Sequence, residues 1–267
     1  MYNRYMGGLA TTRNCEAIVR PLISQDEISR GLISGVTQWN KFGYRDQTAA
    51  ASGEQTLWAL NSNFVIMKTA ETFTITYNNA TDGLGTTGAT QLTFYYLDAN
   101  EKLSIAVHTL GNTGSDVTSF TGLGINGCVC SATGSNEVNA NNITITNTTS
   151  GNDQAIIPAG NGTTQQLIFF APDNATPVVK YLRLRANKLS GSNPKVTFKS
   201  YVWNRGVEST FEIFRDVLDT QSGTLIDIED PCNFPLSSRD VLYFVMDTDQ
   251  NNTVASGRFS LNLYDIL

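Results

Sequence analysis

The chain has 267 residues, 16% of them charged, and a formal net charge of −6 at pH 7. This length is high for one domain, but all-β sandwiches often reach it, and it buries enough surface to fold without a metal or a disulfide. The acidic balance argues against general affinity for nucleic acid. No window approaches about 18 unbroken apolar residues, so we expect no membrane contact. The N-terminus also lacks the apolar core of a signal peptide.

The first 53 residues are predicted to be an extended N-terminal arm. The stretch SRGLISGVTQWNKFGYR (29–45) neither alternates as a strand does nor spaces its apolar residues as a helix does, and three glycines interrupt it. A short helix is plausible near SQDEISRGL, where Ser24 is a candidate N-cap and Glu27 follows three residues later. Apolar residues are lost in DQTAAASGE (46–54). We therefore place an arm at 1–53 and a body at 54–267.

Residues from 64 onward are dominated by strand-like alternation. The predicted strands are TFTITYN (72–78), TQLTFYYLD (90–98), KLSIAVHT (102–109), NNITITNT (141–148), QQLIFFAP (165–172), VKYLRLRANKL (179–189), KVTFKSYVWNR (195–205), VLYFVMDTD (241–249) and GRFSLNLYD (257–265). ESTFEIFRDVL (208–218) fits a strand or a helix. Turn clusters rich in Asn, Gly, Ser and Thr separate the strands. The pattern predicts an all-β fold, an antiparallel β-sandwich or jelly-roll-like body behind the N-terminal arm.

Charge is distributed unevenly along the chain. Seven basic residues lie between positions 180 and 205 with no acidic residue among them, and seven acidic residues follow between 208 and 230. We interpret these runs as two faces that meet within one subunit or between subunits. The alternative is two separate solvated surfaces.

Two segments match the glycine pattern of dinucleotide-binding loops, GLGTTG (83–88) and GLGING (122–127). That motif requires a following helix whose N-terminus faces the pyrophosphate. Both segments continue as strands or loops, so we expect no dinucleotide and no other cofactor.

Catalytic and metal-binding candidates are few. There is one histidine, His108, and the four cysteines contain no C-x-x-C pair, which favours buried thiols over a zinc site. Asp227 and Glu229 share a strand face and are the residues on which an alternative acid/base hydrolase would depend. Together with Asp247 and Asp249 they are also a weak calcium candidate. We expect neither a catalytic nor a metal site, and no enzymatic activity.

Aromatic residues late in the chain suggest a binding face. Lys199, Tyr201 and Trp203 alternate along one predicted strand, a combination that could stack on sugars or on a neighbouring subunit. The alternative is that these residues belong to the core and rim of the sandwich.

The leader motif S-R-G-x-I-S-G followed by K-F-G resembles virion structural proteins of tailed bacteriophages from aquatic habitats, in which such a leader precedes a β-rich body. Later landmarks fit the same outline, among them LRLRANKLSGSNPKVTFKSYVWNRG and the closing SSRDVLYFVMDTDQNNTVASGRFSLNLYDIL. The resemblance implies a virion component, either bracing the capsid from the particle exterior or forming part of the tail or head–tail apparatus. It implies no catalytic residues.

The leader makes physical sense as an assembly arm that orders on a neighbouring subunit. Its glycines would allow sharp bends, and its predicted contact residues are Arg30, Ile33, Trp39, Lys41 and Phe42. The alternative is that residues 28–46 cover the open end of the subunit's own sandwich. The expected partners are other virion proteins and copies of the chain itself. A second hypothesis is a receptor- or glycan-binding tail module that uses Tyr201, Trp203 and the loop at residues 147–152.

Overall fold

The computed structural model describes residues 25–47, 53–188, 194–219, 226–230 and 233–265. The described chain is nearly all β, and its one described helix is the short α3 (Gln25–Ser29), where a helix was predicted. The proposed cap Ser24 lies outside the described residues. Within these ranges, no helix has the length and apolar character needed to cross a membrane.

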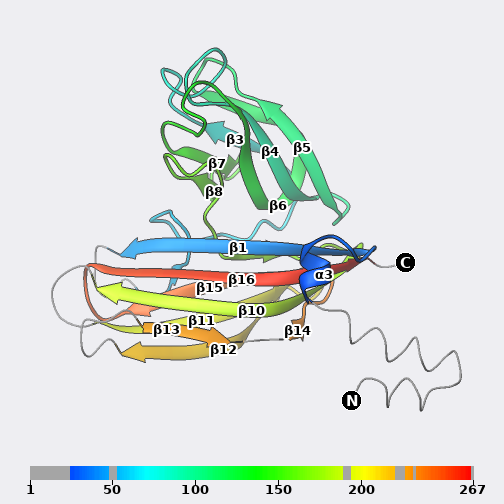
Figure 1. The fold of residues 1–267 in the computed structure, drawn as a ribbon, viewed down its shortest axis with the longest axis vertical. Helices are drawn as coiled ribbons and strands as arrows, with labels where there is room; N and C mark the ends of the chain where they lie inside the picture. Colours follow the sequence, from blue (N-terminus) through cyan, green and yellow to red (C-terminus); the bar gives the residue numbers. More distant parts are fainter. Residues whose placement is uncertain (1–24, 48–52, 189–193, 220–225, 231–232, 266–267) are drawn as a thin grey trace, which may run out of the picture.

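Two antiparallel sheets face each other in the lower part of Figure 1. The first contains, in order, β1 (Val36–Gln47), β16 (Thr253–Asp265), β10 (Ala175–Lys188) and β13 (Ile226–Asp230), with β14 (Phe234–Pro235) also beside β10. The second contains β12 (Ser209–Asp219), β11 (Lys195–Asn204), β15 (Asp240–Thr248) and β2 (Gln55–Thr56), with β9 (Ile168–Phe170) also beside β15. The segment that fitted a strand or a helix is thus the strand β12.

The connectivity of these sheets is that of a jelly roll. The first strand pairs with the last, β1 with β16, and the next pair inward is β2 and β9 with β15. Further inward, β10 pairs with β13 and β11 pairs with β12. This nested antiparallel pairing wraps a long hairpin into two facing sheets. The predicted all-β jelly-roll body is confirmed.

A second unit is inserted between β2 and β9, and we call residues 58–166 the inserted lobe. Its six-stranded sheet has the order β5-β4-β6-β3-β7-β8, from β3 (Glu71–Thr76), β4 (Ala89–Asp98), β5 (Leu103–Thr109), β6 (Ser115–Thr133), β7 (Ile143–Asn147) and β8 (Asp153–Ile157). In Figure 1 it stands beside the edge of the jelly roll at which β1 lies. The prediction of one continuous body at 54–267 did not separate this lobe, because both units alternate with the same period.

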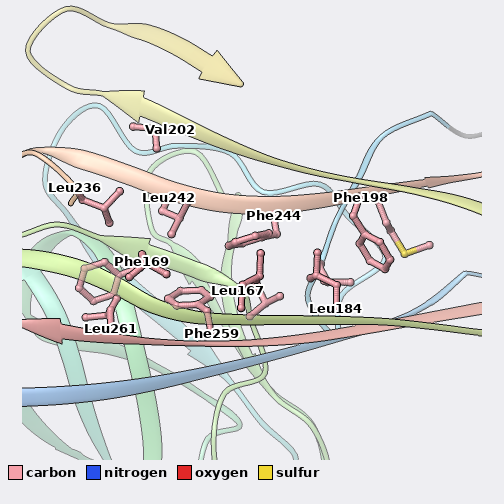
Figure 2. Close-up of a cluster of buried hydrophobic side chains, with 14 of the residues drawn as sticks. Leu167, Phe169, Leu184, Phe198, Val202, Leu236, Leu242, Phe244, Phe259 and Leu261 are labelled. Atoms are coloured by element: carbon pink, nitrogen blue, oxygen red, sulfur yellow. The ribbon is translucent and has the colours of Figure 1, made fainter. Parts of the chain in front are cut away.

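Each unit has its own apolar core. Figure 2 shows the core of the jelly roll, in which side chains of both sheets interdigitate, with Phe244 and Phe259 stacked 5.6 Å apart. The lobe closes around Phe73, Phe94 and other buried residues. A third cluster joins the two units and contains Trp58, Leu97, Leu123, Ile168, Phe170, Trp203 and Val241. The lobe is therefore packed onto the jelly roll through an apolar contact.

The arm prediction needs correction for residues 36–47. These residues form β1 and pair with β16 along their whole length, so they belong to the body's own sheet. The boundary at residue 53 is wrong for them. They stay on their own subunit, as the alternative expected, but as an edge strand of the sheet and not as a cover over an open end. The alternation was obscured because the inward positions carry Trp39, Lys41, Gly43 and Arg45 opposite the inward-facing residues of β16. Residues 1–24 of the predicted arm lie outside the described residues.

The basic and acidic runs meet within one subunit. In the register of β10 and β13, Arg183 lies opposite Glu229 and Arg185 opposite Asp227. On the second sheet, Lys195 of β11 lies opposite Asp219 of β12. Of the two arrangements expected from the sequence, the structure shows the intrasubunit one.

Candidate functional site

The chain leaves the jelly roll at Leu57 and returns at Leu167, and backbone hydrogen bonds close the gap between them. Leu57 N–H donates to Phe244 O over 2.8 Å, and Phe244 N–H donates to Leu167 O over 3.2 Å. Leu167 N–H donates to Leu57 O over 3.1 Å. The strand formed by β2 and β9 therefore continues along β15, and the inserted lobe departs from a single point. We call this point the splice.

Gly43 of β1 lies directly against the splice. A Cβ atom on Gly43 would overlap Leu57 O and lie 2.8 Å from the backbone nitrogen of Leu167. Gly257, its partner on β16, lies under the Leu167 side chain, where a Cβ atom would be 2.5 Å from Leu167 Cδ1. Gly43 thus serves close approach, not the bend that was predicted. Gly31 and Gly35, with φ of 68° and 73°, do adopt left-handed backbone.

Arg45 holds the segment that leaves the splice. Its guanidinium donates to four backbone carbonyls, those of Thr56 (3.2 Å), Leu60 (2.7 Å), Asn61 (2.7 Å) and Ser62 (3.1 Å). Burial lowers the pKa of Arg45 to about 10, so the group stays protonated at neutral pH. A planar guanidinium presents its donors in a fixed fork, which suits a ring of carbonyls.

Lys41 connects β1 to the inserted lobe. Its ammonium donates to the backbone carbonyl of Asn126 on β6. The Asn126 side-chain amide in turn donates to Phe170 O over 2.9 Å and accepts from Phe170 N–H over 2.7 Å. Burial lowers the pKa of Lys41 from its ordinary value of 10.5 to about 7. The K-F-G-Y-R part of the leader motif therefore acts at the junction of the two units.

This burial predicts a pH-dependent stability. As the pH rises from about 7 toward 10.5, the unfolded chain keeps a proton on Lys41 that the folded protein has lost, so the unfolding free energy rises. Below about pH 7 the cost of burying the charge is fully present. We expect the unfolding free energy of wild type relative to Lys41→Met to increase over this window in urea titrations. If the unfolding free energies of the two proteins changed in parallel with pH, this prediction would be contradicted.

A cleft of about 500 Å³ opens between β1 and the outer face of the lobe sheet. Its aromatic lining comes from Trp39, Phe42 and Tyr95, and the Trp39 and Tyr95 rings meet edge to face with centroids 5.6 Å apart. The rest of the lining is Thr37, Gln38, Asn40, Lys41, Leu103, Ile105, Asn126, Gly127, Val129, Thr163 and Thr164. The volume lies within the range of small-ligand sites.

The structure brings together three of the five predicted arm residues. Trp39, Lys41 and Phe42 all line the cleft. Arg30, which is exposed, and Ile33, which is half-buried, lie on the connection between α3 and β1 instead. The arm prediction thus identified part of the cleft wall, although it assigned the residues to contacts with a neighbour.

The second predicted group lies on the other sheet. Lys199 and Tyr201 both contact the Glu54 carboxylate, which accepts a 2.9 Å hydrogen bond from the Tyr201 hydroxyl. Burial and this carboxylate raise the pKa of Tyr201. Trp203 is 6% exposed and belongs to the cluster that joins the two units. The prediction that Trp203 is offered to sugar or a neighbour is wrong, and the alternative of core and rim applies.

The loop at 147–152 is hydrogen-bonded within itself and to Glu71 and Thr72 of β3. The Asn147 side chain is 3% exposed, accepts from Asn152 N–H over 2.6 Å and contacts Ser150. Its amide is therefore occupied within the turn and is not presented to a ligand.

The remaining motifs take structural positions. GLGTTG leads into β4 and GLGING lies within β6, so neither precedes a helix. His108 Nε2 lies 3.6 Å from Asp116 Oδ2, and Asp116 also accepts from the Tyr77 hydroxyl over 2.9 Å.

Candidate metal ligands are not gathered in the described parts of the chain, where no group of three or more His, Cys, Asp or Glu could hold an ion. Cys128 is a buried free thiol, and Cys130 is a half-buried one whose pKa burial raises to about 11. Cys15 and Cys232 lie outside the described residues, as do the side chains of Asp227 and Glu229.

The lobe side of the cleft was missed by sequence reasoning. Tyr95, Gly127 and Thr164 come from separate strands and loops, and only the topology brings them opposite β1. One usable signal is Asn126, a polar residue within the apolar run GLGINGCVC. In the structure Asn126 is 1% exposed. A buried amide must find hydrogen-bond partners, and here it binds Phe170.

No protein-family model and no curated protein matches this sequence. Among solved structures, the VP2 subviral particle of infectious bursal disease virus is 11% identical, with 85% of this chain and 72% of that chain covered and a TM-score of 0.24. The structure of broad bean stain virus is 12% identical, with 78% of this chain and 90% of that chain covered and a TM-score of 0.19. The CBM22 tandem domain of Paenibacillus barcinonensis Xyn10C is 10% identical, with 84% of this chain and 94% of that chain covered and a TM-score of 0.23. These TM-scores are too low to identify a shared fold.

Proposed function

We propose that the protein is a non-enzymatic structural component of a virus particle, of the tailed-phage kind that its leader resembles. It sits on the particle exterior, bracing the capsid or forming part of the tail or head–tail apparatus. Its contacts are with other copies of the chain and with other virion proteins. The observation that carries this proposal is an exposed apolar hollow at the edge strand β12.

The hollow measures about 640 Å³ and lies between β12 and β14. Phe211 and Ile213 line it and are 53% and 44% exposed, and Val207 beside them is 64% exposed. Exposed apolar side chains that gather around one hollow are typical of interaction sites on soluble proteins. Since β12 is the terminal strand of its sheet in the described chain, its outer edge can also pair with another strand. A second copy of the chain, docking edge to edge, would satisfy both features.

The fold supports the proposal by analogy. Jelly rolls serve as capsid domains and as lectins, so the architecture is compatible with a virion role without specifying it. The leader resemblance adds the phage assignment.

The self-association predicted here can be measured by sedimentation over a concentration series. Replacing two apolar residues at the hollow, Phe211→Ser with Ile213→Ser, should weaken association by roughly a hundredfold or more, because central apolar anchors dominate interfaces. Val107→Ser is a matched control, since Val107 is 58% exposed on the lobe, outside the hollow. Wild type that stays monomeric at high concentration would contradict the self-contact.

Copy number in purified particles tests the virion assignment itself. Quantitative mass spectrometry against the major shell protein should give on the order of hundreds of copies for a bracing protein, or on the order of a dozen for a ring at the tail. A protein absent from particles is not a virion component.

A further inference from the structure

The cleft between β1 and the inserted lobe combines apolar walls with a polar rim. Trp39 and Tyr95 form two aromatic walls that meet at 88°, and Phe42, 46% exposed, extends the apolar surface at the mouth. Thr37 and Asn40 are exposed beside these rings, and they place a hydroxyl and an amide at the rim. Thr163 and Thr164 supply further polar groups from the lobe.

The floor of the cleft is left open by a glycine. Gly127 lies opposite Tyr95 in the register of β4 and β6, where a side chain would otherwise cover the neighbouring ring. A Cβ atom on Gly127 would meet one neighbouring atom, Thr164 Oγ1, at 3.9 Å, which is ordinary contact. The space above Gly127 is therefore free, and its backbone does not require a glycine.

The charge of the lining narrows the ligand class. Among the lining residues Lys41 carries the one ammonium, which already donates to Asn126 O, and the lining contains no carboxylate. Within this lining a strongly anionic ligand such as a nucleotide would therefore find little positive charge, since Arg183, Arg185 and Arg258 line separate hollows beside Phe42. A lipid tail would leave the rim hydroxyls and amides without partners, which is costly.

We propose that this cleft binds a neutral carbohydrate, with the C–H faces of successive sugar rings against Trp39 and Tyr95 and the sugar hydroxyls on the amide of Asn40 and the rim threonines. Sugars are amphipathic in the way the cleft is, because one face is apolar and the edge carries donors and acceptors. The proposal does not depend on the virion role, since the hollow at β12 and the cleft share no residues.

Tryptophan fluorescence reports on this site selectively. The chain has three tryptophans, and Trp58 and Trp203 are 0% and 6% exposed, so a ligand-dependent change or protection from acrylamide is expected from Trp39. The probes are the neutral trisaccharides maltotriose, cellotriose, xylotriose, mannotriose and triacetylchitotriose, each titrated to millimolar concentration into the full chain. Trigalacturonic acid is the anionic comparison. At least one neutral trisaccharide should bind.

Two variants locate the binding. Gly127→Leu fills the cleft and should weaken the affinity by about tenfold or more while leaving the melting temperature unchanged. Asn40→Ala should weaken it less, because it removes one exposed amide. Val107 lies on the same face of β5 as the lining residue Ile105 but outside the lining, so Val107→Ala should bind as wild type does. The proposal is overturned if no neutral trisaccharide binds, if the acidic sugar binds more tightly, or if Gly127→Leu binds normally.

Discussion

Replacing Arg45 with alanine is expected to lower the free energy of unfolding by about 3–5 kcal/mol, because each buried carbonyl that loses its donor costs about 1–3 kcal/mol. The guanidinium serves four backbone carbonyls between Thr56 and Ser62, and alanine would leave the buried ones without a donor. Urea unfolding followed by circular dichroism measures the change. Arg45→Lys should recover only part of the loss, since one ammonium cannot reproduce the planar fork.

The control for Arg45 is an arginine whose partners are at the surface. Arg215 donates to Glu212 three residues earlier, and both side chains are solvent-accessible. Exposed pairs contribute little because water and salt screen them, so Arg215→Ala should leave the urea midpoint in place. Equal midpoints for the Arg45 and Arg215 variants would show that the carbonyl ring at the splice is not a stabilising contact.

Gly43→Ala is expected to have the second largest effect, about 3 kcal/mol, at the upper end of what overpacking costs. A single methyl group would overlap Leu57 O and crowd the Leu167 backbone, and these atoms are fixed by the hydrogen bonds of the splice. Thermal and urea unfolding should both detect the loss.

Gly127→Ala is the matched comparison for Gly43, because it adds the same methyl group to a strand where 3.9 Å is available. It should leave stability unchanged or raise it slightly through the unfolded state. If Gly43→Ala were as stable as Gly127→Ala, close packing of β1 against the splice would not be what requires the glycine.

Strands with one apolar face could be predicted from the sequence. The predicted segments at 195–205 and 241–249 appear as β11 and β15 within a residue or two, because alternation reports a half-buried strand directly. β1 could not be predicted in this way. Its buried face carries Lys41, Gly43 and Arg45, whose partners are backbone carbonyls and a close chain contact that become visible only once the lobe is in place.

The division into two units was hidden for a related reason. β2 is two residues long and β9 is three, too short to show a pattern, and both are strands only because they pair end to end with β15. The cleft could not be predicted from the sequence for the same reason. Trp39 and Phe42 were recognisable as residues needing a partner, but Tyr95 and Gly127 are brought to them only by the topology.

The splice also determines how this molecule can change over time. Thr56 and Ile168 lie opposite Val245 and Tyr243, two positions apart on β15, so the whole inserted lobe starts and finishes at neighbouring points. Loops of a segment anchored in this way can lengthen or shorten without altering the register of the strands around it, as long as its apolar contact with the jelly roll is kept. The length of the inserted lobe can therefore vary over time while the strand order and register of the jelly roll stay the same.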